Sequence, residues 1–76
     1  MNISQEDFRW MVEGMTADLI RLLMERDGYT MPEAFSVVYG SATYRALLHP
    51  ESHFYYQSPG YVYSYLKTEL ETGCLQ

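Results

Sequence analysis

A long helix near the N-terminus is the feature that most limits what this chain can fold into. Ser4 and Asp7 have the spacing of a capping box, in which a hydroxyl and a carboxylate satisfy the exposed backbone donors of a helix start. A helix that begins there runs from Gln5 to Asp27 and ends at Gly28, which adopts a left-handed conformation without steric cost. Five of its apolar residues follow a four-three spacing, and Met11 and Leu23 flank them: Phe8, Val12, Met15, Leu19 and Leu22. This spacing predicts one apolar side that faces a core.

The same helix carries a second apolar set. At about 100° per residue, this set falls roughly opposite the first one, and Glu13 interrupts it. Its members are Trp10, Ala17, Ile20 and Met24. A helix that is apolar on two sides must be covered on two sides. In so short a chain, the second cover comes either from the C-terminal half or from another molecule.

Two shorter helices are expected in the middle of the chain. Thr30 and Glu33 form a second capping box, and the proline between them is tolerated in a first turn. That helix ends at Gly40. Ser41 caps the next helix, over residues 42–48, which stops before Pro50 because a residue that precedes proline avoids the helical region.

The last helix begins at Ser58 and Pro59, with the serine as cap and the proline at the first helical position. Its expected buried residues are Val62, Tyr65 and Leu66, with Tyr61 and Leu70 less central. Gly73 ends this helix, and residues 73–76 are expected to fray.

Residues 49–57 are the ambiguous stretch. Phe54, Tyr55 and Tyr56 have strand propensity, but nothing nearby offers a pairing partner. We therefore expect an ordered aromatic loop, with a short extended segment at 53–57 as the alternative. The whole pattern predicts an all-α fold: a compact bundle of one long and three shorter helices, in a single domain over residues 1–76.

Composition excludes several classes of function. The 76 residues are 47% hydrophobic and 16% aromatic, which is too apolar for a disordered tail. A core of this size rarely supplies more than about 3–5 kcal/mol, so self-association is expected. The net charge is −5, and binding nucleic acid depends on Lys and Arg. A helix-turn-helix around Gly40 and Ser41 would offer only Arg45 as a base-reading cation, so we expect no nucleic-acid partner.

No targeting or membrane-spanning segment is evident in the sequence. The N-terminus has neither a basic region nor an apolar stretch of the kind found in signal peptides. Uninterrupted apolar runs reach two or three residues, against the roughly 20 needed to cross a bilayer. We therefore expect a cytoplasmic location and no membrane partner.

The residues that could carry chemistry do not form a recognisable site. His49 and His53 have a zinc-ligand spacing, but Pro50 lies between them and no thiolates complete a tetrahedron. Glu51 is the only close carboxylate, and nothing marks a nucleophile. Cys74 follows a helix C-terminus and two glutamates, where the field opposes a thiolate. We expect no enzymatic activity, no metal and no cofactor.

Tyrosines are unusually frequent, and seven of the eight lie in the second half of the chain. They either complete a small core or form a recognition surface, since tyrosine is enriched at protein interfaces. Tyr63 is expected to point away from the core, and Tyr55 and Tyr56 cannot both be buried in an extended segment. The residues expected to contact a partner are Trp10, Ile20, Met24, Tyr55, Tyr56 and Tyr63.

Residues 39–48 and 55–63 resemble a family of short bacterial proteins of unknown function, and the resemblance covers roughly residues 30–72. It implies a helical single domain. Because some family members are encoded beside toxin-like genes, it also implies an accessory or antitoxin-like role. Ser52, His53 and Phe54 stand where the family has a Thr-Gly-Leu type of turn, so a role tied to that loop does not carry over.

Two functions follow from these patterns. The preferred one is a non-enzymatic interaction module, which forms a homodimer or binds another bacterial protein through the long helix and the exposed tyrosines. The alternative is a small-molecule-binding regulatory domain, whose pocket would be lined by Tyr55, Tyr56 and Tyr61.

Overall fold

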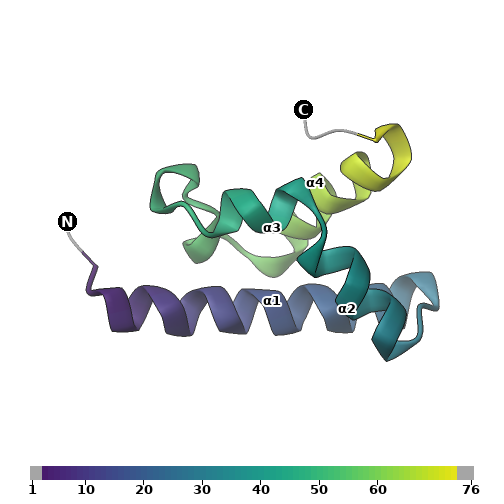
Figure 1. Cartoon of the computed structure of the whole chain (residues 1–76), viewed down its shortest axis with the longest axis horizontal. Helices are drawn as coiled ribbons and strands as arrows, with labels where there is room; N and C mark the ends of the chain where they lie inside the picture. The colour runs from purple at the N-terminus through teal and green to yellow at the C-terminus, as the bar shows by residue number, and fades with distance from the viewer. Residues whose placement is uncertain (1–2, 74–76) are drawn as a thin grey trace.

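A computed structural model describes residues 3–73 and shows an all-α fold, which confirms the predicted class (Figure 1). The helices are α1 (Gln5–Asp27), α2 (Met31–Tyr39), α3 (Ala42–Leu47) and α4 (Pro59–Thr72). Two single 3-10 turns, η1 (Pro50–Ser52) and η2 (Phe54–Tyr56), connect α3 to α4. The described part of the chain contains no strand.

α1 begins and ends where the sequence predicts, and the serine half of its predicted capping box is formed. The Ser4 hydroxyl accepts a hydrogen bond from the backbone N–H of Asp7 at 3.1 Å. At the other end, Gly28 is left-handed (φ 72°) and its N–H donates to the carbonyl of Leu23. Both caps satisfy backbone groups that a helix end otherwise leaves without partners.

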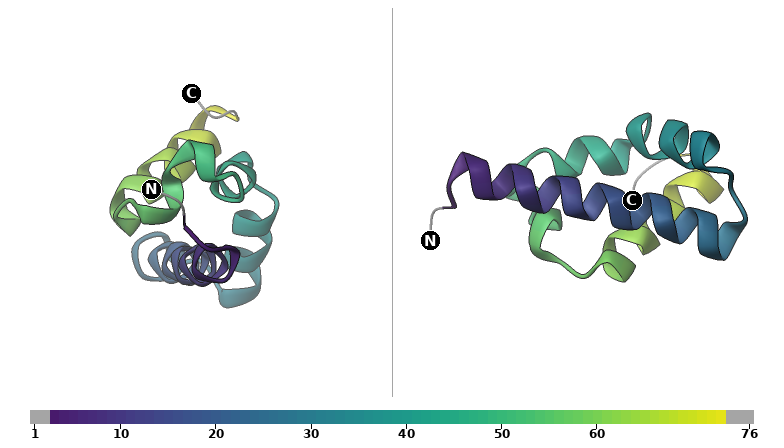
Figure 2. Two further views of the ribbon diagram at one scale, coloured as in Figure 1. Left: turned by 90° about the vertical axis from the view of Figure 1, so that its left-hand side faces the viewer. Right: turned by 90° about the horizontal axis from the view of Figure 1, so that it is seen from below.

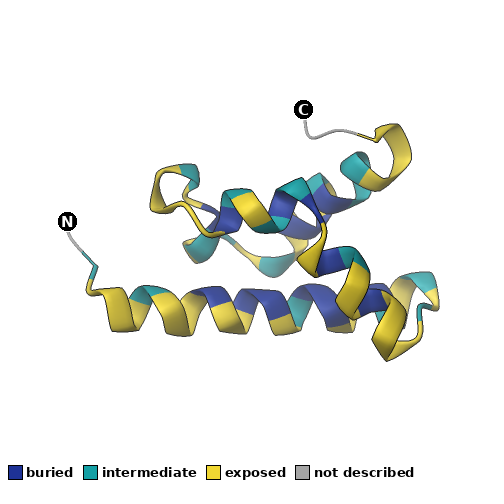
Figure 3. Cartoon of the chain, viewed as in Figure 1, coloured by how far each residue is buried: buried dark blue, intermediate teal, exposed yellow. Residues whose placement is uncertain are grey.

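The core lies on one side of α1, and the remaining elements gather there (Figure 2). The buried side of α1 faces them, while its opposite side is exposed along the whole helix (Figure 3). The core residues of α1 are Val12, Met15, Leu19, Ile20, Leu22 and Leu23. They pack with Ala34, Val38, Leu47, Phe54, Val62, Tyr63 and Leu66.

The extended segment considered for residues 53–57 is wrong, because these residues form a helical turn instead. The N–H of Gln57 donates to the carbonyl of Phe54 at 3.2 Å, which closes η2. A 3-10 turn sends successive side chains in three directions, whereas a strand offers two. Phe54 can therefore pack on Tyr65 of α4, and its neighbour Tyr55 on Phe8 of α1, each with ring centroids 5.0 Å apart.

A carboxylate from α4 holds the start of α3. Glu69 accepts hydrogen bonds from the backbone N–H of Ala42 (2.7 Å), from the N–H of Thr43 (2.9 Å) and from the Thr43 hydroxyl (2.8 Å). The Ser41 hydroxyl accepts from the N–H of Tyr44 at 3.0 Å. The first backbone donors of α3 are thus all satisfied, although a helix of this length would not be stable alone.

Replacing Glu69 should therefore destabilise the whole fold. In Glu69→Ala, three donors at the start of α3 lose their acceptor, and we expect the free energy of unfolding to fall by about 2 kcal/mol. Urea denaturation measures this change. Glu71→Ala, an exposed carboxylate two residues further on, is the matched control and should change stability by less than about 0.5 kcal/mol. Equal losses in the two variants would contradict the capping role.

The same contact predicts an acid-dependent stability. Burial raises the pKa of Glu69, but the hydrogen bonds from Ala42 and Thr43 and the charge of Arg45 outweigh it, so the pKa lies below its ordinary value. A carboxylate with a lowered folded-state pKa stabilises the fold above its unfolded pKa of about 4.3, and this contribution is lost as the pH falls through the folded pKa. Denaturation between pH 6 and pH 3 should therefore show a shallower loss of stability in Glu69→Ala than in the wild type.

Candidate functional site: an apolar groove between α1 and α2

An apolar groove lies between α1 and α2, where the buried side of α1 meets its exposed side. From α1 it is lined by Ala17, Ile20 and Met24, and from α2 by Met31, Phe35 and Tyr39, with Arg21 and Glu25 also at its edge. Its volume is about 430 Å³. The second apolar set of α1 is thus partly covered by α2 and partly open.

The α2 side of this groove is unusually exposed for apolar residues. Met31 is 55% exposed, and Phe35 and Tyr39 are each 47% exposed. The Phe35 and Tyr39 rings stack at 5.2 Å, and the Tyr39 ring meets Tyr44 edge-on at 4.8 Å. The opposite side of α2 is fully buried through Ala34 and Val38. This short helix is therefore apolar on two sides, as α1 is, and only one side meets the core.

Charges at the edge of the groove are paired within α1. Arg21 contacts Asp18 at 3.2 Å and Glu25 at 3.3 Å, and all three side chains are partly or largely exposed. Such exposed pairs contribute little to stability. They leave one cation between two carboxylates beside the apolar lining, so this edge carries a net negative charge.

The structure brings two of the predicted contact residues of α1 to the groove and places the third beyond it. Ile20 lines the groove but is only 8% exposed, and Met24 is half-buried at the same surface. Trp10 is 69% exposed and lies two turns before Ala17 on the same outer side of α1. Trp10 is the most exposed of the large apolar side chains in the described residues.

The expected outward orientation of Tyr63 is wrong. Tyr63 is 9% exposed, and its hydroxyl donates a 2.7 Å hydrogen bond to Asp27, at the end of α1. Lys67 contacts the other oxygen of the same carboxylate at 2.9 Å, and the Arg26 guanidinium lies 5.5 Å from the Tyr63 ring centre. Because α4 packs against α1 at this end of the helix, Tyr63 belongs to the core.

These contacts shift the titration of both partners. The hydrogen bonds from Lys67 and from Tyr63 lower the pKa of Asp27 despite its partial burial. Burial first, and then the hydrogen bond to Asp27, raise the pKa of the Tyr63 hydroxyl. A charged Asp27 therefore ties a neutral Tyr63 to the end of α1.

Of the tyrosines proposed for a small-molecule pocket, Tyr55 and Tyr56 contact each other, with their rings edge-on at 5.1 Å. Tyr55 is half-buried against Phe8, whereas Tyr56 is exposed and stacks on His53 at 5.5 Å. The hydroxyls of Tyr61 and Tyr65 lie 3.3 Å apart on α4. The hollow beside them holds about 270 Å³ and is lined by α4 alone, through Tyr61, Ser64, Tyr65 and Thr68.

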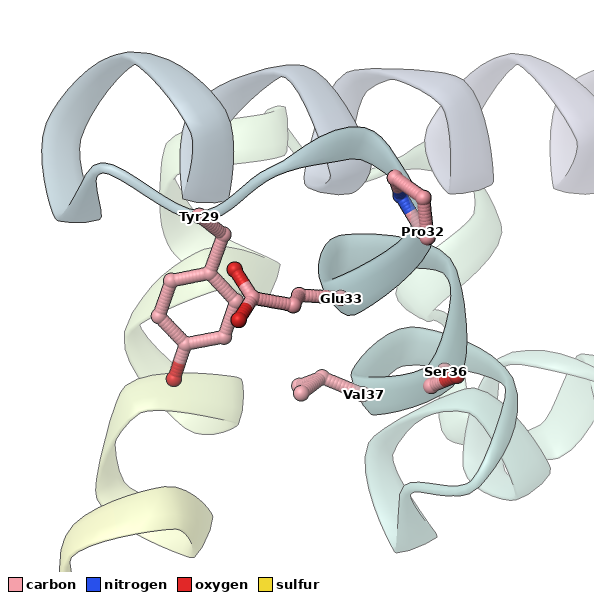
Figure 4. A pocket seen from close by; sticks show the side chains of 5 residues that line it. All are labelled: Tyr29, Pro32, Glu33, Ser36 and Val37. Atoms are coloured by element: carbon pink, nitrogen blue, oxygen red, sulfur yellow. The ribbon is translucent and has the colours of Figure 1, made fainter.

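A larger hollow of about 570 Å³ lies where the α1–α2 loop meets α2 (Figure 4). Its lining is Tyr29, Pro32, Glu33, Ser36 and Val37. Glu33 is the only carboxylate there, and it accepts a 2.8 Å hydrogen bond from the N–H of Thr30 as part of the helix cap. That backbone bond, and then the Thr30 side chain, lower the pKa of Glu33. The one charged group of this hollow therefore has a structural role.

The candidate metal ligands lie at the surface, outside any cluster of ligating side chains in the described residues. His49 and His53 are both exposed, and residues 3–73 contain no group of three or more metal-ligating side chains. Cys74 lies outside the described residues. Within the same described range, no helix is both long and apolar enough to cross a bilayer.

Comparison with protein-family models, curated proteins and solved structures returns no match for this chain. The resemblance of residues 30–72 to a bacterial family therefore stays a prediction.

Tyr63 offers a direct test of its place in the core. Tyr63→Phe removes the hydroxyl and leaves the Asp27 carboxylate without one of its donors, so we expect a loss of about 1 kcal/mol in the free energy of unfolding. Tyr56→Phe is the control, because Tyr56 is exposed and keeps its ring contacts as phenylalanine. An unchanged stability in Tyr63→Phe would show that the Asp27 contact contributes nothing.

Proposed function

We propose that this chain is a non-enzymatic protein–protein interaction module, and that its contact surface is the groove between α1 and α2 together with Trp10. The observation that carries the proposal is the row of exposed apolar side chains on both helices: Trp10, Met31, Phe35 and Tyr39. Exposed apolar surface of this kind, edged by charges, is typical of protein interaction sites.

The groove has the features of a site for a helix or an apolar side chain. Its lining is flexible, with two methionines, and aromatic, with two stacked rings. Methionine-rich surfaces adapt to a partner's shape, and exposed aromatic rings supply large contact area. Charged groups stand at its edge and not in its centre, as in the polar rim of an interface.

The partner is either a second copy or another protein of the same cell. An accessory or antitoxin-like role agrees with the resemblance noted for residues 30–72. The net charge of −5 favours a protein partner over nucleic acid, and a cytoplasmic location is part of the same proposal. A pocket for a small molecule at Tyr55, Tyr56 and Tyr61 gains no support, because the hollow at Tyr61 is lined by α4 alone and includes neither of the other two tyrosines.

Site-specific photocrosslinking tests this proposal. Position 35 lines the groove and is partly exposed, so a benzophenone amino acid there can reach a bound partner. We expect it to form a covalent protein adduct of defined mass in the cells that produce the chain. The same amino acid at Leu70, a comparably apolar position on α4 that is 39% exposed, is the matched control. The adduct should disappear when Met31→Asp is combined with the probe, because a carboxylate in the groove disfavours apolar contact.

Two results would contradict the proposal. One is the absence of any adduct from position 35 above the level at position 70. The other is an adduct that persists in Met31→Asp, which would indicate contact without use of the groove.

A further inference from the structure

We infer that the occupant of the groove is a second copy of this chain, in an antiparallel pairing of two α1 helices about Ala17 that places Trp10 of each copy in the groove of the other. This inference rests on the proposed function, since it names the partner of the same surface. It follows from the positions of a few residues on the outer side of α1.

Trp10, Ala17 and Met24 are evenly spaced along that outer side. They are seven residues apart, which is close to two helical turns, so they lie along one line about 10.5 Å from each other. Trp10 is exposed at one end of this line, and Met24 lines the groove at the other. Trp10 and Met24 are therefore equidistant from Ala17, which itself lines the groove.

An antiparallel pair with its two-fold axis at Ala17 brings these two features together twice. Trp10 of one copy then lies level with Met24 of the other, where Met31 of α2 extends the apolar surface. An indole next to two thioethers is a favourable contact. Both copies bury their most exposed apolar side chain in the same event, and the assembly closes as a dimer.

The centre of the pairing allows a close approach of the two helices. Ala17 is small and exposed, and one turn earlier Gly14 has no atom within 4 Å of the position that a Cβ would occupy. The distance between packed helices depends on the side chains at the contact. Small residues at the crossing let the longer side chains on either side reach the other copy.

The charges on this side of α1 favour the antiparallel direction. Glu13 and Arg21 lie four residues on either side of Ala17, so each stands level with its opposite charge in the second copy. Both side chains are exposed. A parallel pair would instead bring Glu13 level with Glu13 and Arg21 level with Arg21, and like charges across an interface are unfavourable.

Solution mass against concentration is the first test. Light scattering after size exclusion should give twice 8.9 kDa for the wild type at about 100 µM. Ala17→Lys places two like charges at the centre, and we expect the dimer dissociation constant to rise by at least about 100-fold. Ser64→Lys, which adds the same charge on the exposed outer side of α4, should leave the dimer unchanged.

Loss of fold must be separated from loss of pairing. Ala17 is exposed in the monomer, so Ala17→Lys should keep its helical circular dichroism signal. Trp10→Ser is a second variant, which removes the protruding side chain and leaves the centre intact. It should also weaken the dimer while keeping the helical signal.

Cysteine crosslinking fixes the register, in a Cys74→Ser background. Ala17→Cys should crosslink with itself, because the two copies meet at this position and a disulfide needs Cα atoms within about 7 Å. Met24→Cys alone should not, since its two copies lie about 21 Å apart along the helix axes. A parallel pair would crosslink both variants with equal ease, and random collision would crosslink Ser64→Cys as well.

The outcomes separate this inference from the proposed function. A monomeric wild type, or a dimer that survives Ala17→Lys, overturns the second copy as occupant. If the probe at position 35 then still captures another protein through the groove, the proposed function stands and only the identity of the occupant is wrong. If that capture also fails, both the second copy as occupant and the proposed function are wrong.

Discussion

The structure depends on one constraint: α1 is the longest of the described helices, and the core is built against it. α2, η2 and α4 all contact it, and α3 contacts α2 and α4. Three short helices are enough to bury one side of α1, through residues such as Leu19 and Leu23, but not to enclose it. The chain therefore completes a core and still leaves apolar side chains outside it. The exposed apolar surface therefore follows from the difference in length between α1 and the short helices that pack against it.

The helix caps and ends, which depend on residues close in sequence, could be predicted from the sequence. The caps at Ser4, Thr30 and Ser58 and the helix end at Gly28 are set by residues within five positions, and all of them form. Contacts across the chain were not legible. The hydroxyl of Tyr63 meets a carboxylate 36 residues away, and Glu69 caps a helix 27 residues before it. No local pattern marks such a partner, so the position of Tyr63 was predicted wrongly.

Only the α1 side of the groove could be predicted, because the placement of α2 beside it depends on contacts across the chain. The second apolar side of α1, with Ile20 and Met24, is visible in the spacing of its residues. The contribution of α2 to this groove was not predicted. Yet Met31, Phe35 and Tyr39 are spaced by four, which places them on one side of a helix. That spacing is the signal that could have revealed the surface, but only the structure shows that it lies beside the open side of α1.

The cap that Glu69 provides has a consequence for how the chain folds as it is made. A helix as short as α3 is marginal in water, and its first donors find their acceptor in a residue that is synthesised much later. Residues 42–47 therefore cannot settle into their final form until position 69 has left the ribosome. Until then α1 and α2 can pair, because their contacts are close in sequence. Residues 42–47 still lack the Glu69 carboxylate that caps them. The order of synthesis is thus not the order of folding.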